Sequence, residues 1–444
     1  MFGPVTKAST RVDSLDRVAD TLRQAFRLAT TGRPGPVHIE FENHHGDALE
    51  RLEGDLDPTA EARFGQVPPF RPAPDPGDVE RAAECLAKAS RPVIVAGGGV
   101  RQSGARAELA ALAEELSIPI ATSLTGKDAI PATHPLAVGT VGLYSRETAN
   151  RVVAEADLVF FVGTRTGSLV THSWRLPPPG TDVIQCDIAP DVLGLNYRNV
   201  ASLNGDARRS LALLLEAARA IRRRTDRSAW TARCASIVAD WSAANAGLLN
   251  SDAVPIRPER LCRELSDALP ANAVVVSCTG HAGMWTAGML DLQSPGQGFL
   301  RAAGSLGWAF PASLGAQCAL PDRPVVCFTG DGGLSYHLGE LETMARWNIP
   351  ATIVVNNNNA YNQGTRLWTA AYEGELHGQH ERLWRFHEIN FANVAREMGV
   401  TAFRVEQPGN IAAALRAAIA TSGPSLVEVV TDPEARAPQA YLPE

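Results

Sequence analysis

The sequence lacks the features that define several large classes of protein. No apolar run reaches the roughly 18 residues of a membrane-spanning helix, and no CxxC pair or HExxH motif is present to bind zinc. The spacing of serine, cysteine and histidine supports no nucleophilic triad. The net charge is −7, and the one basic run, Arg222-Arg223-Arg224, is better explained as a solvated helix face. We therefore expect neither a membrane nor a nucleic acid as partner.

Closely spaced cysteines are also lacking, because the seven cysteines are scattered along the chain. Cys186, Cys278 and Cys327 lie in apolar, strand-like runs, where a thiol behaves as a small buried hydrophobic group. This pattern is typical of a reducing compartment and not of a disulfide framework. It predicts a cytoplasmic protein with free cysteines.

The sequence does have a length and a composition suited to several packed domains. Its 444 residues are 45% hydrophobic and 20% charged, which is ordinary for globular proteins. Two stretches, 77–218 and 254–432, alternate continuous apolar runs with helical segments. Such runs are typical of parallel strands that are covered on both faces. We predict an α/β fold with two doubly wound parallel-sheet domains, preceded by a remnant of a third.

The other stretches are expected to connect or flank these domains. Residues 48–76 are rich in proline, which predicts an extended linker. Residues 219–253 are polar with helical spacing and predict a second linker, and residues 433–444 predict a loose tail.

Residues 1–47 contain too few elements to form a domain. A helix is predicted over 15–31 and a strand over 37–41. One helix and one strand cannot bury a core alone. We therefore expect this stretch to be the last part of a domain.

The most informative motif is a carboxylate between glycines, Gly330-Asp331-Gly332, at the end of a predicted strand. A second predicted strand, ATIVV, ends in Asn356-Asn357-Asn358-Asn359. Because neighbouring parallel strands end at the same edge of a sheet, we expect a carboxylate and an amide oxygen to lie close together there. Hard oxygen ligands of this kind suit Mg²⁺, which usually also binds phosphate oxygens. The glycines let the backbone approach a diphosphate closely.

Two other features have the form of a nucleotide site, and each has a simpler explanation. Gly97-Gly98-Gly99 follows a strand and precedes a helix predicted over 105–116, which is a partial GxGxxG pattern or only a tight turn. Asp187 ends another strand, where an aspartate holds a ribose hydroxyl or caps a turn. A nicotinamide dehydrogenase built on the glycines is the least supported hypothesis, because the acidic residue expected on the next strand is missing.

Two loops in the second large stretch lie where ligands bind α/β sheets. Thr279-Gly280-His281-Ala282-Gly283 follows the run AVVVSC and offers backbone N–H groups and one imidazole. A structural role for His281 is equally consistent with this pattern. Small residues surround Leu306 in the run GSLGWAFP, which taken alone is a loop leading into a helix over 312–319.

Taken in order, these motifs resemble the thiamine-diphosphate-dependent enzymes of the acetohydroxyacid synthase, pyruvate oxidase and benzoylformate decarboxylase group. GDG…NN resembles the cofactor motif of that family, AAGSLGWAFPASLGA its stretch around the thiazolium ring, and TSLTGKDAIPATHPLAVGTVGLYS its central domain. The resemblance implies thiamine diphosphate and Mg²⁺, with Asp331, Asn358 and the carbonyl of Ala360 as metal ligands. The implied cofactor contacts are Gly280, His281, Ala282, Gly304, Ser305, Leu306, Gly330, Asp331, Gly332, Gly333, Asn358, Ala360 and Tyr361.

The resemblance also implies an activity and an assembly. Leu306 would hold the cofactor in a bent conformation, and the carbonyl of Gly304 would accept a hydrogen bond from its aminopyrimidine. The family chemistry adds the cofactor to the carbonyl of a 2-keto acid and releases CO₂. We therefore expect an acetolactate synthase-like transferase or a 2-keto acid decarboxylase or lyase. A homodimer or homotetramer is implied, because in this family the cofactor lies between domains of two subunits.

The sequence departs from the family pattern at the group that activates the cofactor. The family uses a glutamate as a proton relay, early in an N-terminal pyrimidine-binding domain, and residues 1–47 resemble only the last part of that domain. Glu40 and Glu42 follow the wrong elements to replace it. A truncated product, a separately encoded segment and a loss of catalysis are three explanations. We favour truncation, because the resemblance stops inside a domain.

Three smaller departures concern the first domain, the flavin and the substrate. ENHHGD at 42–47 replaces the usual proline–aspartate ending. Residues 163–170 lack the acidic pair that the synthases carry beside their flavin, which argues against FAD. Asn362-Gln363 stand where the synthases have Gly-Met, so their substrate pocket is not reproduced.

Two hypotheses follow from these observations. The first is a thiamine-diphosphate-dependent carboligase or decarboxylase that acts on a 2-keto acid or a related acyl donor. The second is an incomplete, non-catalytic chain that binds the cofactor and needs a partner to supply the glutamate.

Overall fold

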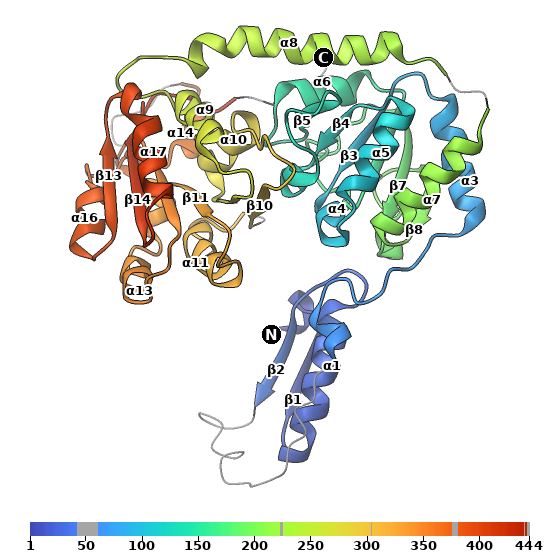
Figure 1. Cartoon of the computed structure of the whole chain (residues 1–444), viewed down its shortest axis with the longest axis horizontal. Coiled ribbons are helices and arrows are strands. Elements are labelled where there is room, and N and C mark those ends of the chain that lie inside the picture. Colours follow the sequence, from blue (N-terminus) through green and yellow to red (C-terminus); the bar gives the residue numbers. More distant parts are fainter. Residues whose placement is uncertain (42–60, 223–224, 303, 375–380, 439, 442–444) are drawn as a thin grey trace.

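The strands of the protein form three separate parallel sheets. The computed structural model describes residues 1–41, 61–222, 225–302, 304–374, 381–438 and 440–441. One sheet has two strands and the others have six each (Figure 1). The predicted α/β class with two doubly wound parallel sheets is confirmed. The ENHHGD run, residues 48–60 of the proline-rich stretch and Arg223-Arg224 lie outside the described residues.

The first six-stranded sheet has the order β5-β4-β3-β6-β7-β8. Its strands are β3 (Pro92–Ala96), β4 (Ile120–Thr122), β5 (Ala137–Thr140), β6 (Leu158–Val162), β7 (Asp182–Asp187) and β8 (Asn199–Asn204). The helices around it are α3 (Pro76–Lys88), α4 (Gly98–Ser103), α5 (Arg106–Leu116), α6 (Glu147–Glu155) and α7 (Ala207–Ala220). Strands β5 and β8 were not predicted, because neither has a continuous apolar run.

Strand β3 shows why the sequence of this sheet is apolar without alternation. Val93 and Val95 belong to the core that includes α6 and α8 (Ser228–Leu249), whereas Ile94 and Ala96 belong to the core that includes α3, α5 and α7. Because both faces of the strand are buried, no position is left for a polar side chain.

The glycines after β3 open a different helix from the one predicted. They begin α4, and α5 starts only at Arg106, after Gly104 at φ 66°. A Cβ on Gly97 would lie 2.2 Å from the carbonyl oxygen of Gly163. The close approach of these two loops requires glycine, which supports the tight-turn explanation.

The second six-stranded sheet has the order β10-β9-β11-β12-β14-β13. Its strands are β9 (Val274–Ser277), β10 (Gly298–Arg301), β11 (Val325–Gly330), β12 (Thr352–Asn357), β13 (Thr401–Val405) and β14 (Ser425–Val430). Its helices are α9 (Pro258–Ala268), α10 (Gly280–Gly288), α11 (Ala309–Ala319), α12 (Asp331–Ser335), α13 (Glu340–Arg346), α14 (Asn362–Ala371), α15 (Glu381–Trp384), α16 (Phe391–Glu397) and α17 (Ile411–Ile419). Among the described strands of this sheet, only β13, in which Arg404 interrupts a short apolar stretch, was not predicted.

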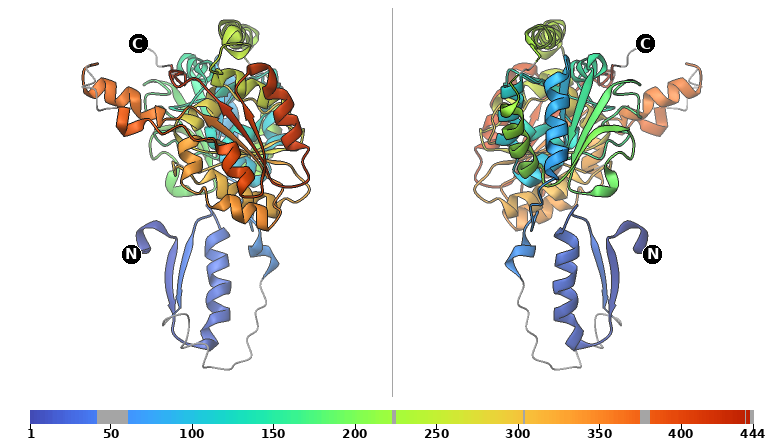
Figure 2. Two further views of the ribbon diagram at one scale, coloured as in Figure 1. Left: turned by 90° about the vertical axis from the view of Figure 1, so that its left-hand side faces the viewer. Right: turned by 90° about the vertical axis from the view of Figure 1, so that its right-hand side faces the viewer.

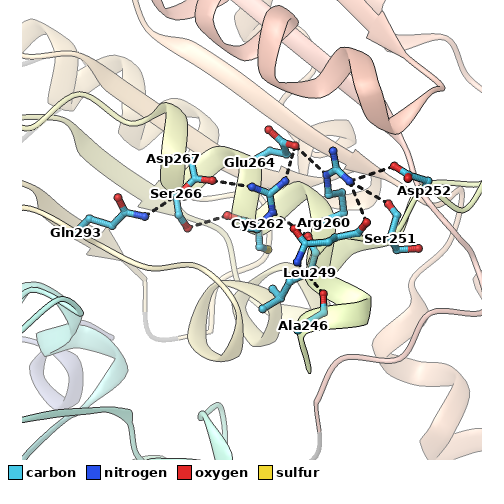
Figure 3. A network of polar contacts seen from close by, with 12 residues as sticks. Ala246, Leu249, Ser251, Asp252, Arg260, Cys262, Glu264, Ser266, Asp267 and Gln293 are labelled. Carbon is cyan, nitrogen blue, oxygen red and sulfur yellow. Dashed lines mark hydrogen bonds and ion pairs between the residues drawn. The ribbon is translucent and has the colours of Figure 1, made fainter. Parts of the chain in front are cut away.

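The long helix α8 runs along the side of both large sheets (Figure 1). A helix was predicted for this connecting stretch. The corner after α8 is fixed by Arg260, which donates to the carbonyl oxygens of Asn250 at 3.2 Å and Ser251 at 3.4 Å and pairs with Glu264 at 2.8 Å (Figure 3). Among the described helices, α8 included, none is apolar over a stretch long enough to cross a membrane.

The two-stranded sheet belongs to a small unit that projects from the rest of the protein (Figure 2). It comprises β1 (Ala8–Val12), β2 (Val37–Phe41) and α1 (Val18–Thr30). Strand β2 has the predicted bounds, α1 is shorter than predicted, and β1 was not predicted. Phe26 and Leu22 on α1 are 53% and 39% exposed. The unit therefore leaves an apolar helix face uncovered.

Candidate cofactor and metal site

The two motifs predicted to meet at one sheet edge do meet there. Strands β11 and β12 are parallel neighbours with Gly330 opposite Asn356. Asp331 follows directly, at the start of α12, and its side chain is buried. Its Oδ1 accepts the backbone N–H of Gly332 at 2.8 Å, and its Oδ2 accepts that of Ala360 at 2.9 Å. One carboxylate therefore connects the loops that follow both strands.

The charge of Asp331 is not balanced by the protein. No ion pair to lysine, arginine or histidine is present for it among the described residues. Burial raises the pKa of this carboxyl to about 7, although the backbone hydrogen bonds from Gly332 and Ala360 lower it. A buried carboxylate without a cation is costly. A bound metal ion would supply the missing charge.

The four consecutive asparagines differ in what they contact. Asn356 accepts a hydrogen bond from the hydroxyl of Thr431 at 2.7 Å, and Asn357 donates to the buried carboxylate of Glu428 at 2.7 Å. The side chain of Asn358 is buried but makes no hydrogen bond to any residue that the structure describes. The side chain of Asn359 has no such bond either, but Asn358 lines the cavity described below and Asn359 does not. The amide oxygen of Asn358 is therefore the one available to a ligand there, as the resemblance implied.

The two glycines that follow Asp331 lie so close to neighbouring side chains that a larger residue does not fit there. A Cβ on Gly332 would lie 2.3 Å from Cε1 of Tyr361, and a Cβ on Gly333 would lie 2.6 Å from Oγ1 of Thr329. Gly280 has φ 67°, in the left-handed region that favours glycine. It opens α10 at the end of β9, so backbone N–H groups of a helix start face the same region.

These residues line one cavity of about 390 Å³. Of the predicted cofactor contacts, Gly304 and Ser305 do not line it, and both are exposed. The lining residues that were predicted are Gly280, His281, Ala282, Leu306, Gly330, Asp331, Gly332, Gly333, Asn358, Ala360 and Tyr361.

The cavity also has an apolar side that the sequence did not reveal. Trp368, Leu383 and Trp384 line it, and Trp368 lies 6.5 Å from Trp384 between ring centroids. In the sequence, only the aromatic residues that follow the asparagine run could have indicated this apolar side. Without the fold, nothing distinguishes them from residues of an ordinary core.

His281 is held in the cavity wall by one nitrogen only. Its Nε2 accepts the backbone N–H of Ala437 at 2.9 Å, and its ring packs edge-on against Trp285 at 5.3 Å. Its Nδ1 is buried without a hydrogen-bond partner among the described residues. Burial lowers the pKa of the imidazole to about 4, so His281 is neutral near pH 7. Because Nε2 accepts, the proton lies on Nδ1.

The implied metal and cofactor fit what these residues offer. The predicted metal ligands include one carboxylate, one amide and one backbone carbonyl, and no cluster of three or more His, Cys, Asp or Glu that would suit another metal is found in the described part of the chain. An uncompensated carboxylate, a free amide oxygen and a glycine-lined space suit Mg²⁺ with a diphosphate.

A second, larger cavity of about 790 Å³ lies beside the first sheet. Gly98, Gly99 and Asp187 all line it, so the structure does bring these two predicted features together. Asp187 accepts the backbone N–H of Ala189 at 3.0 Å, which agrees with the turn-capping alternative. Arg301 also lines this cavity. The expectation against FAD concerns this region and stays a prediction.

Comparison with known proteins agrees with the fold and with this site. Residues 79–214 match the model of the thiamine pyrophosphate enzyme central domain, and residues 279–429 match that of the C-terminal TPP binding domain. The chain therefore belongs to the thiamine pyrophosphate enzyme family, as its motifs suggested.

Individual relatives give the same assignment. A probable acetolactate synthase large subunit of Methanocaldococcus jannaschii is 32% identical over 443 residues, which cover 98% of this chain and 73% of the relative. A glyoxylate carboligase of Escherichia coli O157:H7 is 32% identical over 448 residues, covering 97% and 72%. The acetolactate synthase isozyme 3 large subunit of Escherichia coli K12 is 27% identical over 423 residues, covering 94% and 71%.

Proposed function

We propose that this protein is a thiamine-diphosphate- and Mg²⁺-dependent carboligase or decarboxylase of the acetolactate synthase-like type. The observation that carries the proposal is the buried, uncompensated carboxylate of Asp331 beside the free amide of Asn358 in a glycine-lined cavity. The relatives named above, two acetolactate synthases and a glyoxylate carboligase, support a carboligation. The proposed substrate is a 2-keto acid or a related acyl donor.

Each part of the cavity has a role in holding the cofactor. Asp331, Asn358 and the carbonyl of Ala360 would bind Mg²⁺. The glycines after β9 and β11, with His281 and Ala282, would contact the diphosphate, and Leu306 would support the rings, whereas Gly304 and Ser305 lie outside this cavity. When bound, the cofactor supplies a nucleophilic carbon and stores the electron pair released with CO₂.

The chain's own residues orient the cofactor and limit the access of water. Half-buried Leu306 and buried Trp384 give the cavity apolar walls, which strengthen the interaction between a metal ion and Asp331. Two amide side chains that line the cavity are engaged within the protein. Asn362 donates to the carbonyl of Pro433 at 2.7 Å, and Gln363 donates to the hydroxyl of Tyr144 at 2.7 Å. These amides position loops as well as facing the cavity.

Calorimetry with thiamine diphosphate and Mg²⁺ tests the proposal, followed by a decarboxylation assay on pyruvate. We expect Mg²⁺-dependent binding that is lost in Asp331→Ala. Asp322→Ala is the matched control, because Asp322 is an exposed aspartate at the other end of β11. Unchanged Mg²⁺-dependent binding by Asp331→Ala would rule out the cofactor assignment.

A second candidate function is a cofactor-binding chain that needs a partner to supply the activating glutamate. The apolar face left uncovered on α1 favours it, because a two-stranded sheet with one helix has little core of its own. Binding without turnover by the chain alone is the expected result for this candidate. Turnover by the chain alone would exclude it.

The proposed assembly is a homodimer or homotetramer. Light scattering on the eluting peak of a size-exclusion column, with and without the cofactor, measures this directly. A monomer of 47.3 kDa under both conditions would contradict it.

A further inference from the structure

Glu428 is a fully buried carboxylate of the second large sheet that does not line the cofactor cavity. It lies on β14, where it pairs with Val355 of β12. Because side chains alternate along a strand, Asn357, two residues beyond Val355, lies on the same face of the sheet as Glu428. A carboxylate in such a place is costly unless charged and hydrogen-bonding partners surround it.

Both oxygens of Glu428 have partners within the protein. Oε1 accepts hydrogen bonds from Arg404 at 2.6 Å and from the side-chain amide of Asn357 at 2.7 Å. Oε2 accepts the backbone N–H of Ala392, at the start of α16, at 2.9 Å. The ion pair with Arg404 compensates the charge. Glu428 is therefore occupied by its neighbours, and its influence on the cofactor site has to pass through one of them.

The neighbour that leads towards the site is Asn357, whose amide is held in one orientation. Its Nδ2 donates to Glu428 and also to the carbonyl oxygen of Ile389 at 3.2 Å. Turning the amide round would bring Oδ1 against these two acceptors. Oδ1 therefore faces the other way, where it accepts the backbone N–H of Asn359 at 3.1 Å.

The hydrogen bond from Asn359 to Asn357 closes a turn around Asn358. Strand β12 ends at Asn357, so the regular ladder of the sheet stops before Asn358. Asn359, on the other side, has φ 52°, in the left-handed region. Asparagine side chains that bond to the backbone two residues further on stabilise such turns. Asn358 lies inside this turn, so its position depends on the orientation of the Asn357 amide.

We propose that Glu428 is a positioning residue for the metal site, because it holds the Asn357 amide in the orientation that closes the turn around Asn358. This inference rests on the proposed function, in which Asn358 is a metal ligand. Glu428 acts through Asn357 and touches neither the metal ion nor the cofactor. Partners that orient metal ligands in this way affect metal affinity without binding the metal.

Two substitutions of Glu428 separate positioning from charge and burial. Glu428→Gln and Glu428→Met both remove the charge and have a similar length. The glutamine oxygen can still accept from Asn357 and Arg404, whereas methionine offers neither of them an oxygen. Arg404 keeps its ion pair with Glu406 at 2.8 Å in both variants. Glu428→Gln is therefore the matched control.

The first test uses the protein without metal or cofactor. Hydrogen exchange, read by mass spectrometry on peptides that overlap at Asn359, reports on the turn. We expect the Asn359 amide to exchange about tenfold faster in Glu428→Met than in the wild type, the order of one hydrogen bond. Glu428→Gln should resemble the wild type. Equal exchange in the wild type and Glu428→Met would overturn the proposal.

The second test is calorimetry of Mg²⁺ binding in the presence of thiamine diphosphate. We expect the Mg²⁺ affinity to fall about tenfold in Glu428→Met, as is usual when a residue that orients a metal ligand is lost. Glu428→Gln should lose much less. A general loss of stability would not distinguish the variants by the oxygen that they offer to Asn357, so equal affinities in both would refute the positioning role.

The outcomes separate this proposal from the proposed function. Mg²⁺ affinity equal to that of the wild type in Glu428→Met would refute the role of Glu428, while the proposed function would stand. No binding by the wild type would refute the proposed function, and hydrogen exchange at Asn359 would still decide whether Glu428 controls the turn. If Glu428→Met does not fold, Glu428→Met with Arg404→Met replaces the whole buried ion pair, which is often tolerated, and must give the same losses.

Discussion

Asp331, at the end of β11, accepts the backbone N–H of Ala360, after β12, at 2.9 Å. The carboxylate therefore holds in place the loop whose carbonyl is proposed as its fellow metal ligand. The same side chain gives shape to the site and provides its charge. In the absence of a metal ion these two roles oppose each other, because the buried charge is uncompensated.

Asp331→Asn should separate stability from metal binding. At pH 8 we expect the variant to be more stable than the metal-free wild type by roughly 1–3 kcal/mol, because it removes a buried, uncompensated charge. Mg²⁺ with thiamine diphosphate should raise the melting temperature of the wild type only. Thermal melts with and without both ligands measure this, and a variant that Mg²⁺ still stabilises would contradict it.

The stability difference between Asp331→Asn and the metal-free wild type should also depend on pH. Burial raises the folded-state pKa of Asp331 to about 7, above its unfolded value of 3.8. The folded protein therefore binds the proton more tightly, and this group favours folding less as pH rises from about 4 through 7. The gain from Asp331→Asn should thus be clearly smaller at pH 5 than at pH 8. A gain that is the same at pH 5 and pH 8 would show that the lost charge is not its cause.

Two neighbours in the asparagine run should respond in opposite ways to the same substitution. Asn357→Ala removes a donor from buried Glu428, which should cost roughly 1–3 kcal/mol of folding stability. Asn358→Ala should leave stability nearly unchanged, because its amide makes no hydrogen bond to the described residues, and should weaken Mg²⁺-dependent cofactor binding. Urea unfolding and calorimetry on both variants check this. Equal stability losses in the two variants would argue against Asn358 as the ligand.

Gly332→Ala should close the cavity by a steric effect that a second substitution relieves. The new Cβ would lie 2.3 Å from Cε1 of Tyr361, so the ring must move or the loop must shift. We expect cofactor affinity to fall, and Tyr361→Ala in the same chain to restore part of it. Tyr361→Ala alone provides the fourth corner of the double-mutant cycle. Additive losses in the double variant would show that the clash with Tyr361 is not the cause.

The sequence predicted the β11–β12 edge well because its signals are local. A continuous apolar run, a glycine and a polar residue at a strand end are enough to place Asp331 near the asparagines. The sequence could not tell by itself which asparagine faces the cavity, because Asn357 and Asn358 differ only in contacts with distant residues such as Glu428. Strand β13 and the burial of residues 435 and 437 could not be predicted from local signals either. Their positions are set by tertiary contacts, and neither has an apolar run of its own.

The buried imidazole of His281 should make the protein less stable in mild acid. Burial lowers its folded-state pKa to about 4, below the unfolded value of 6.5. The unfolded chain therefore binds the proton more readily, so the contribution of His281 is fully present above pH 6.5 and is lost as pH falls towards 4. Over that window the loss amounts to roughly 3 kcal/mol. His281→Gln cannot take up this proton, and the acidic residues that titrate in the same range are common to both proteins. Urea unfolding at pH 7.5 and pH 5 should thus show a larger fall in the free energy of unfolding for the wild type than for His281→Gln. Equal falls in the two proteins would mean that His281 is more solvated than its place in the cavity wall implies.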